Sequence, residues 1–324
     1  MRILVTGGAG FIGSNLAERL LQQKKVSLVR ILDNLATGSI DNIDHLKADG
    51  RFEFVQGDIR DYNKCLEVCK DIDVVSHQAA LGSVPRSIID PLTTNDVNIT
   101  GTLNVFNAAK EQKVTRVVYA ASSSTYGDHP GLPKKEDRIG NPLSPYAVTK
   151  FVNELYARVY SNVYGLELIG LRYFNIFGPR QNPNGPYAAV IPLFIEAFLS
   201  GHSPVINGDG EHSRDFTYVD NAVQANLLSL FTDNKTAINQ VYNIACGQQT
   251  TLLQLFESLK EAAGSSLQPV FAPDRKGDVI HSLADISKAA QLLGYNVGIT
   301  VKEGLLKTFN WYKQNRSVSS STIQ

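Results

Sequence analysis

Few features of this sequence favour a secreted, membrane-bound or nucleic-acid-binding protein. It has three cysteines, Cys65, Cys69 and Cys246, which are too few for a disulfide framework and lack the spaced Cys or His partners of a metal site. The formal net charge is zero, and no long basic run offers a surface to a polyanion. No apolar stretch is long enough to span a bilayer, and the N-terminus lacks signal-peptide features. We therefore expect a soluble cytoplasmic protein that binds no metal, membrane or nucleic acid.

What is present is a strand, a glycine-rich turn and a helix at the start of the chain. Residues 2–5 form a short apolar run typical of a buried parallel strand, and residues 14–22 have a helical pattern. Between them lie Gly7, Gly8, Gly10 and Gly13. They fit both G-x-G-x-x-G and G-x-x-G-x-x-G, in which the backbone turns tightly and approaches a pyrophosphate. The helix would direct free N–H groups and its positive dipole end at the phosphates, so the stretch predicts a dinucleotide site.

The next predicted strand supports this interpretation. It covers residues 27–32 and ends at Asp33, about 20 residues beyond Gly13. A carboxylate at that position accepts hydrogen bonds from a ribose 2′-hydroxyl and repels a 2′-phosphate, which favours NAD over NADP. The alternative is that Asp33 is a solvated residue at the start of a loop. The order of strand, glycines, helix and strand favours the nucleotide site.

Strand and helix patterns alternate over the first half of the chain. Further strands are predicted near residues 52–55, 74–77, 116–120 and 167–172, and helices near 62–69, 98–112 and 146–164. This alternation predicts an α/β fold with a doubly wound parallel sheet of the Rossmann type. The ligand of such a sheet lies at the carboxyl ends of the strands. The residues expected at those ends are Asp58, Ala79, Ala80 and Ser122.

The composition changes after Arg172. Segments rich in Gly, Pro, Asn and charged residues follow, which predicts a smaller, loop-rich substrate domain that closes over the cofactor. Residues 215–245 again have helix and strand patterns and are expected to return to the first domain. The expected boundaries are 1–172 with 215–245 for the NAD-binding domain, 173–214 and 246–315 for the substrate domain, and 316–324 for a flexible tail.

A second chemical pattern, Ser-Pro-Tyr-Ala-Val-Thr-Lys, opens the helix predicted at 146–164. Ser144 is a good N-cap, and Tyr146 and Lys150 share one helix face because they are four residues apart. A lysine ammonium beside a phenol lowers the phenol pKa, so the pair can act as an acid–base unit, with Ser122 to hydrogen-bond a substrate hydroxyl. Tyr-x-x-x-Lys alone is common and usually structural, but its place behind a dinucleotide fold favours catalysis.

These segments resemble, in order, those of the extended short-chain dehydrogenases/reductases, and among them the NAD-dependent nucleotide-sugar epimerases. The matching segments are 7–13, 58–59, 79–80, 122–127, 146–150, 172–175, 214–216 and 275–278. The resemblance implies a proton relay of Ser122, Tyr146 and Lys150. It implies NAD contacts from Gly7, Gly10, Phe11, Ile12, Gly13, Asp33, Asn34, Asp58, Ile59, Ala79, Ala80, Asn98, Tyr146, Lys150 and Tyr173. It implies UDP-sugar contacts from Ser122, Ser123, Ser124, Tyr146, Asn175, Ala189, Val190, Arg214, Arg275, Asp278 and Ser282.

Departures from other branches of this family narrow the expected reaction. The related sugar dehydratases carry an acidic pair where this chain has Ser123 and Ser124, and decarboxylating relatives carry Glu at the place of Ser124. Uronate epimerases usually have Thr where this chain has Asn175. The resemblance therefore implies a simple 4-epimerase, in which NAD takes hydride from the sugar C4, Tyr146 takes the hydroxyl proton, and the 4-keto sugar turns over before reduction. The reaction is redox-neutral, so NAD is expected to stay bound.

The expected substrate depends on one position above all. Relatives that act only on plain hexoses place a Tyr where this chain has Ser282, and a small residue leaves room for an N-acetyl group. The loop at 184–189 also looks like that of epimerases of N-acetylhexosamines. We therefore expect UDP-N-acetylglucosamine, and we keep UDP-glucose and UDP-uronic acids as alternatives. A further alternative is a non-catalytic sensor of a nucleotide sugar or NAD, which the intact acid–base set disfavours.

The resemblance also implies a homodimer. The helices near 98–112 and 146–164 would pack against those of a second copy in a four-helix interface. Their apolar positions could equally belong to the core of a monomer.

Overall fold

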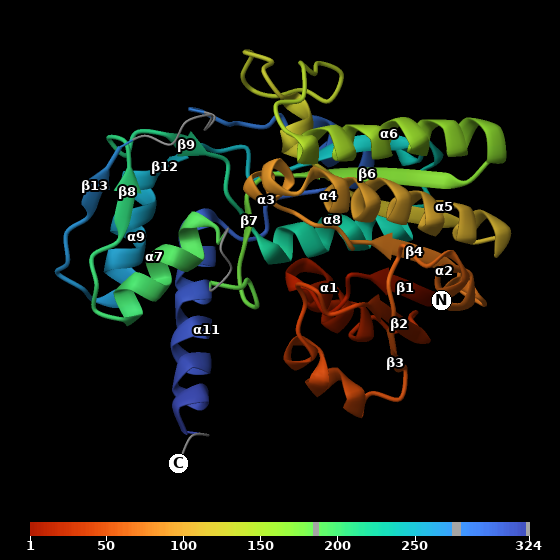
Figure 1. Cartoon of the computed structure of the whole chain (residues 1–324), viewed down its shortest axis with the longest axis horizontal. Helices are drawn as coiled ribbons and strands as arrows, with labels where there is room; N and C mark the ends of the chain where they lie inside the picture. Colours follow the sequence, from red (N-terminus) through yellow and green to blue (C-terminus); the bar gives the residue numbers. More distant parts are fainter. Residues whose placement is uncertain (184–187, 274–279, 322–324) are drawn as a thin grey trace.

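A seven-stranded parallel sheet organises the larger part of the computed structural model (Figure 1), which describes residues 1–183, 188–273 and 280–321. Its strands are β1 (Arg2–Thr6), β2 (Leu28–Asp33), β3 (Phe52–Gln56), β4 (Val74–His77), β5 (Arg116–Ser122), β6 (Glu167–Tyr173) and β11 (Gln240–Ile244). They lie in the order β11-β6-β5-β4-β1-β2-β3. The chain reverses direction across the sheet between β1 and β4, as in doubly wound folds, so the prediction of a Rossmann-type α/β fold is confirmed.

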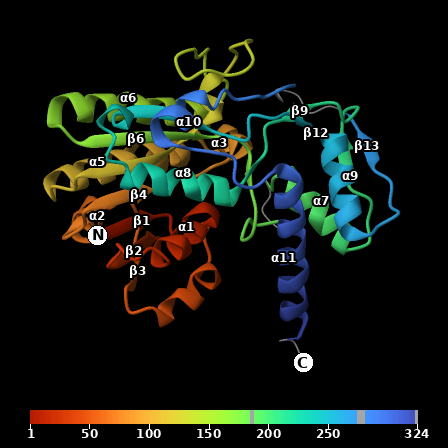
Figure 2. The same ribbon diagram turned by 180° about the vertical axis from the view of Figure 1, so that it is seen from behind.

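Helices cover both faces of this sheet (Figures 1 and 2). One face carries α1 (Phe11–Leu21), α8 (Val219–Phe231) and α10 (Ser287–Leu293), and the other carries α2 (Tyr62–Cys69), α5 (Gly101–Glu111) and α6 (Pro145–Tyr164). A hydrophobic core lies on each face of the sheet, and successive residues of β1 point into the two cores alternately. Ile3 and Val5 pack on the α1 side, and Leu4 packs on the α2 side. A strand buried on both faces must be apolar throughout, which explains the continuous apolar run in the sequence.

A smaller region lies to one side of the sheet, at the left of Figure 1. It contains α7 (Val190–Leu199), α9 (Leu252–Ala263) and α11 (Val301–Ser321), with the strand pairs β7 (Ile176–Phe177) and β10 (Thr217–Tyr218), β8 (Val205–Asn207) and β13 (Val270–Ala272), and β9 (Ser213–Arg214) and β12 (Thr250–Thr251). The rings of Phe194 and Phe198 pack against Phe256 with centroids 6.4 and 5.5 Å apart, which joins α7 to α9.

Some elements differ from the expectations. The helix expected at 98–112 belongs to a longer run in which α4 (Pro91–Asn95) leads through a π turn, Asp96–Thr100, into α5; a short helix, α3 (Val84–Ile89), precedes it. The sequence pattern predicts neither the π turn nor α3. A π turn inserts one residue into a helix without changing its composition, so it leaves no signal in the sequence. At the C-terminal end of the chain, the helix α11 continues to Ser321, whereas the sequence analysis expected a flexible tail from residue 316.

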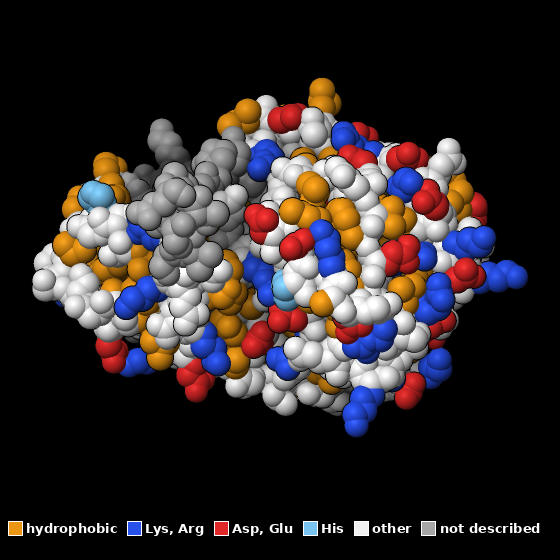
Figure 3. Space-filling model, turned by 90° about the horizontal axis from the view of Figure 1, so that it is seen from below, with side chains coloured by type: hydrophobic (Ala, Val, Ile, Leu, Met, Phe, Trp, Pro, Cys, Tyr) orange, Lys and Arg blue, Asp and Glu red, His pale blue; other side chains and the backbone are white. Residues whose placement is uncertain are grey.

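The surface is of mixed charge. On the face seen in Figure 3, acidic and basic side chains lie interspersed, with hydrophobic side chains between them. Within the described ranges, no helix combines the length and apolar content needed to cross a bilayer. The same residues contain no group of three His, Cys, Asp or Glu side chains placed to hold a metal ion.

Candidate active site

A cavity of about 630 Å³, which we call the central cavity, lies at the carboxyl ends of the strands. Its wall contains all but one of the residues expected to contact NAD. Those in the wall are Gly7, Gly10, Phe11, Ile12, Gly13, Asp33, Asn34, Asp58, Ile59, Ala79, Ala80, Tyr146, Lys150 and Tyr173. The sheet topology explains this gathering, because parallel strands bring all their following turns to one edge.

The glycine-rich turn fits a dinucleotide closely. Gly7 has a φ of 67°, and a Cβ there would lie 2.6 Å from the backbone nitrogen of Ala79. A Cβ on Gly13 would collide with the Gly7 carbonyl, so α1 can pack tightly on the turn only because residue 13 lacks a side chain. No side-chain cap occupies the N-terminus of α1 at Gly10. The first helical residues, 11–13, line the central cavity, where free N–H groups at a helix N-terminus can bind a pyrophosphate.

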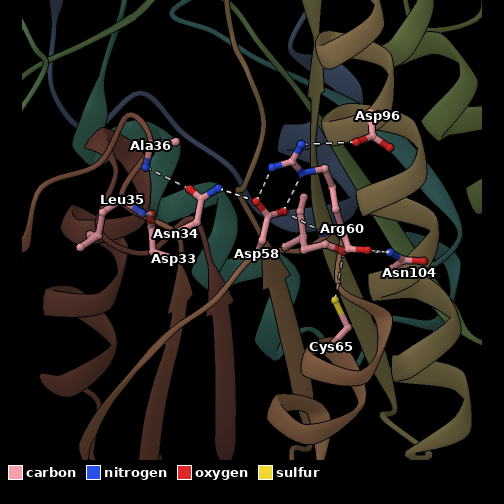
Figure 4. Close-up of polar contacts among 10 residues, drawn as sticks. Asp33, Asn34, Leu35, Ala36, Asp58, Arg60, Cys65, Asp96 and Asn104 are labelled. Carbon is pink, nitrogen blue, oxygen red and sulfur yellow. Dashed lines mark hydrogen bonds and ion pairs between the residues drawn. The ribbon is translucent and has the colours of Figure 1, made fainter.

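Two acidic side chains, Asp33 and Asp58, also line the cavity. Figure 4 shows their polar contacts. Asp33 accepts hydrogen bonds from the backbone nitrogens of Ala9 at 2.9 Å and Leu35 at 2.8 Å. Burial raises its pKa. Asp58 forms a bidentate pair with Arg60, at 3.0 Å from Nε and 2.8 Å from Nη2, and accepts a third hydrogen bond from Asn34. The pair with Arg60 lowers the pKa of Asp58 to about 2.

Arg60 is a cavity residue that the sequence analysis missed. It follows Asp58 so closely that its backbone nitrogen also donates to that carboxylate, at 2.8 Å. The segment Asp-Ile-Arg carried a signal, since an Arg two residues after a carboxylate can form this compact pair. Gln78 was missed as well: its Oε1 accepts a hydrogen bond from the Tyr173 hydroxyl at 3.1 Å, on the cavity wall.

Asn98 lies behind the wall of the central cavity rather than in it. It sits in the π turn and is fully buried. Its Oδ1 accepts from the backbone nitrogen of Leu81 at 2.8 Å, and its Nδ2 donates to the Leu81 carbonyl at 3.2 Å. Since Leu81 lines the cavity, Asn98 fixes the course of the chain there without reaching the ligand space.

Ser122, Tyr146 and Lys150 come together at the middle of the cavity. Ser122 ends β5, and the Ser144 hydroxyl caps α6 by accepting from the Ala147 nitrogen at 3.1 Å, as its sequence predicts. Burial raises the pKa of Tyr146, and a hydrogen bond with Ser122 opposes this rise. The Lys150 ammonium, which is 4% exposed, donates to the Ala120 carbonyl at 2.9 Å, and burial lowers its pKa to about 8.

The expected lowering of the Tyr146 pKa by Lys150 is not found. The Lys150 Nζ lies 5.9 Å from the centroid of the Tyr146 ring and is engaged by Ala120, so burial dominates the pKa of the phenol. The arrangement still places a hydroxyl, a phenol and an ammonium within one wall. Together they can exchange a proton with a bound hydroxyl and hold positive charge beside it.

Two further cavities, each of about 230 Å³, adjoin the central one. We call the first the α7 cavity; among its lining residues are Ala189, Val190, Arg214 and Phe216. We call the second the serine cavity; among its lining residues are Ser123, Ser124, Tyr126, Lys134, Arg214 and Ser282. Asn175, with a φ of 39°, lines all three cavities. Arg275 and Asp278, which are both expected to contact the UDP-sugar, lie outside the described residues, as does most of the loop at 184–189.

Comparisons with known proteins agree with this geometry. Residues 3–245 match the NAD dependent epimerase/dehydratase family. The chain is 40% identical to a UDP-N-acetylglucosamine 4-epimerase from Methanobrevibacter ruminantium M1, solved in complex with UDP-N-acetylmuramic acid, with a TM-score of 0.91 over 97% of this chain and 98% of that one. A UDP-glucuronic acid 4-epimerase from Bacillus cereus, solved with UDP-glucuronic acid and NAD, is 35% identical with a TM-score of 0.89, over 97% and 100% of the two chains.

A putative UDP-glucose 4-epimerase of Methanocaldococcus jannaschii is 39% identical over 97% of this chain and 99% of its own length. These relatives share the reaction at the sugar C4 and differ in the sugar that they are named for. The chain is therefore an NAD-dependent nucleotide-sugar epimerase of the NAD dependent epimerase/dehydratase family, within the extended short-chain dehydrogenases/reductases.

Proposed function

We propose that this enzyme interconverts UDP-N-acetylglucosamine and UDP-N-acetylgalactosamine. The observation that carries the choice of substrate is the serine cavity, where Ser282 lies with Ser123 and Ser124 next to the catalytic wall. Three small hydroxyl side chains leave space for an N-acetyl group and offer it hydrogen-bond partners. The 40% identity to a UDP-N-acetylglucosamine 4-epimerase supports the same choice.

In the proposed mechanism, Tyr146 accepts the proton of the sugar 4-hydroxyl and returns it after the sugar has turned over. The Ser122 hydroxyl, which hydrogen-bonds the phenol, orients the sugar oxygen. The Lys150 ammonium keeps a positive charge in the same wall of the cavity. Bound NAD supplies the hydride chemistry at C4, with no net oxidation of the substrate. The residues that would hold NAD are those of the central cavity, with the pyrophosphate at Gly10 and the adenosine ribose at Asp33.

The two side cavities divide the rest of the UDP-sugar between them. We assign the α7 cavity, with Ala189, Val190 and Phe216, to the uridine, because it is flanked by backbone and an aromatic ring. Arg214 lines both side cavities, so its guanidinium is placed for the diphosphate between them. Asn175, like Arg214, lines both side cavities. Arg275 and Asp278 are proposed to complete the grip on the diphosphate and ribose.

Two neighbouring substrates are the alternatives. UDP-glucose would fit the same cavities with space left over, and the relative from M. jannaschii is named for it. A UDP-uronic acid would place a carboxylate in the serine cavity, and the B. cereus relative was solved with one.

The test is to incubate the purified protein, without added cofactor, with each of UDP-N-acetylglucosamine, UDP-glucose and UDP-glucuronic acid, and to separate the products. Formation of UDP-N-acetylgalactosamine at the highest kcat/KM would support the proposal. A higher kcat/KM for either other substrate would assign the enzyme to that sugar instead. Tyr146→Phe should lower kcat by about 10²-fold or more while UDP binding persists. No conversion of any substrate, even after NAD is added, would refute the enzymatic assignment.

The homodimer is part of the proposal. Along α6, Val148, Leu155, Val159 and Val163 are between 45% and 65% exposed, and they form one stripe at helical spacing. An apolar stripe of this length on a helix is typical of an interface with another helix. We propose that α5 and α6 pack against the same helices of a second copy. We also propose that the chain divides into an NAD-binding domain and a substrate domain near the expected boundaries, with α10 counted to the NAD-binding domain because it packs on the sheet. The three cysteines are free thiols, which agrees with the proposed cytoplasmic location.

A further inference from the structure

Asn243, on the edge strand β11, is a fully buried side chain to which the catalytic proposal gives no part. Its Oδ1 accepts a hydrogen bond from the Tyr126 hydroxyl at 2.6 Å. Its Nδ2 donates to the Lys134 carbonyl at 2.9 Å and to the Asp285 carbonyl at 3.0 Å. The amide thus joins three segments that are far apart in the sequence.

The chemistry of these partners fixes the orientation of the amide. Backbone carbonyls can only accept hydrogen bonds, so the NH₂ group of Asn243 must face Lys134 and Asp285. The remaining oxygen then receives the Tyr126 proton. In addition, the Asn243 backbone nitrogen donates to Glu136 at 2.9 Å, on the same loop as Lys134. Both amide donors and the amide oxygen are therefore used.

The three segments that meet at Asn243 form the walls of the serine cavity. Tyr126 and Lys134 line it directly, and Asp285 ends the short stretch that begins with the lining residue Ser282. Lys134 also pairs with that stretch, since its backbone nitrogen donates to Leu283 at 2.7 Å. The Arg172 guanidinium lies 4.8 Å from the centroid of the Tyr126 ring, so both the face and the hydroxyl of this ring are held. Asn243 itself lines none of the three cavities.

We propose that Asn243 is a positioning residue for sugar recognition: it sets the distance between the Tyr126 and Lys134 wall and the Ser282 wall, and thereby the size of the space beside the sugar ring. This inference rests on the proposed function, because it takes the serine cavity as the sugar site. None of the partners of Asn243 lines the α7 cavity or the central cavity. Affinity for the sugar should therefore depend on Asn243, and affinity for UDP or NAD should not.

Asn243→Asp tests this with almost no change of shape. An ionised carboxylate would face two carbonyl oxygens with no proton to donate, and a protonated carboxyl could donate to only one of them. At least one bond is lost in either case, so the walls would separate or admit water. By calorimetric titration, affinity for UDP-N-acetylglucosamine should fall about tenfold or more, with affinity for UDP alone and the NAD content of the purified protein unchanged. In turnover, KM should rise by a similar factor, and the ratio of kcat/KM for UDP-N-acetylglucosamine over UDP-glucose should change.

Asn221→Asp is the matched control. Asn221 is 1% exposed, and like Asn243 it donates to a backbone carbonyl, that of Ile299 at 2.7 Å, and accepts through its oxygen, from Gly298 and Ile299 at 3.1 Å. It lines none of the three cavities. This variant should lose stability as Asn243→Asp does and keep the wild-type KM. Equal effects of the two variants on sugar affinity would overturn the proposal, as would equal losses of UDP, NAD and sugar binding in Asn243→Asp.

Tyr126→Phe provides a second measurement should Asn243→Asp fail to fold. It removes only the hydroxyl that anchors the ring to Asn243 and keeps the aromatic wall. A rise in KM for UDP-N-acetylglucosamine at constant UDP affinity supports the proposal, and an unchanged KM overturns it. Failure of the proposed function is recognised separately: the wild-type protein would then prefer another UDP-sugar or epimerise none of them, whereas titration would still report whether Asn243 controls sugar binding.

Discussion

Replacing Glu154 by Gln removes the carboxylate that neutralises a guanidinium inside the protein. Glu154 on α6 holds Arg172 on β6 through two hydrogen bonds of 2.8 and 2.7 Å, with the side chains 8% and 4% exposed. Burial lowers the pKa of Arg172, and pairing with Glu154 outweighs this effect. A guanidinium is not deprotonated in proteins, so the arginine also stays charged in the variant. The other neighbours of Arg172 are the Glu136 carbonyl, at 3.1 Å, and the Tyr126 ring.

Breaking a buried ion pair from one side costs about 3–5 kcal/mol, because the remaining charge has lost both its partner and its water. The variant should therefore unfold at markedly lower urea concentration, with that decrease in the free energy of unfolding. Glu53→Gln is the control: Glu53 is 42% exposed and pairs with Arg30 at 3.0 Å, so its loss should cost about 0.2–1 kcal/mol. If Glu154→Gln cost no more than Glu53→Gln, the claim that α6 is fixed to the sheet by this buried pair would be refuted.

Three further outcomes are expected. Burial lowers the pKa of Lys150 to about 8. We therefore expect kcat to fall as the pH rises through 8, because the positive charge beside Tyr146 is then lost. A kcat that stays constant from pH 7 to 10 would contradict this role of Lys150. Gly7→Ala should yield protein largely free of NAD, measured by absorbance after denaturation, because the new Cβ would meet the Ala79 backbone at 2.6 Å in a left-handed conformation; normal NAD content would argue against a nucleotide at this turn. Ser282→Tyr should lower kcat/KM for UDP-N-acetylglucosamine more than for UDP-glucose, and equal losses would end its role in selecting the sugar.

The sequence was most informative where one residue type has one physical use. Only glycine suits residues 7 and 13 of the turn, and an apolar run as short as 2–5 is typical of a strand buried on both faces, so the sheet and its nucleotide edge could be predicted. The spacing of Tyr146 and Lys150 placed both on one helix face, and the structure brings them to the wall that also contains Ser122.

Features that depend on contacts between distant segments could not be predicted in the same way. Burial in the folded chain raises the pKa of Tyr146, and the acceptor of Lys150 is the Ala120 carbonyl, which the distant strand β5 supplies. The place of Asn98 depends on a π turn, which has no compositional signature. The importance of Asn243 arises from three loops that meet only in the folded chain, whereas in the sequence it reads as one polar residue in an apolar strand.

The position of Asn175 has a thermodynamic consequence. Because this single residue forms part of the wall of all three cavities, a ligand that shifts its backbone in one cavity reshapes the other two. Cofactor and nucleotide sugar then bind with a coupling free energy, and that coupling is reciprocal: whatever NAD does to the affinity for the sugar nucleotide, the sugar nucleotide does to the affinity for NAD. Whenever the coupling is favourable, the bound substrate increases the affinity for NAD and so helps the enzyme to keep its cofactor during turnover.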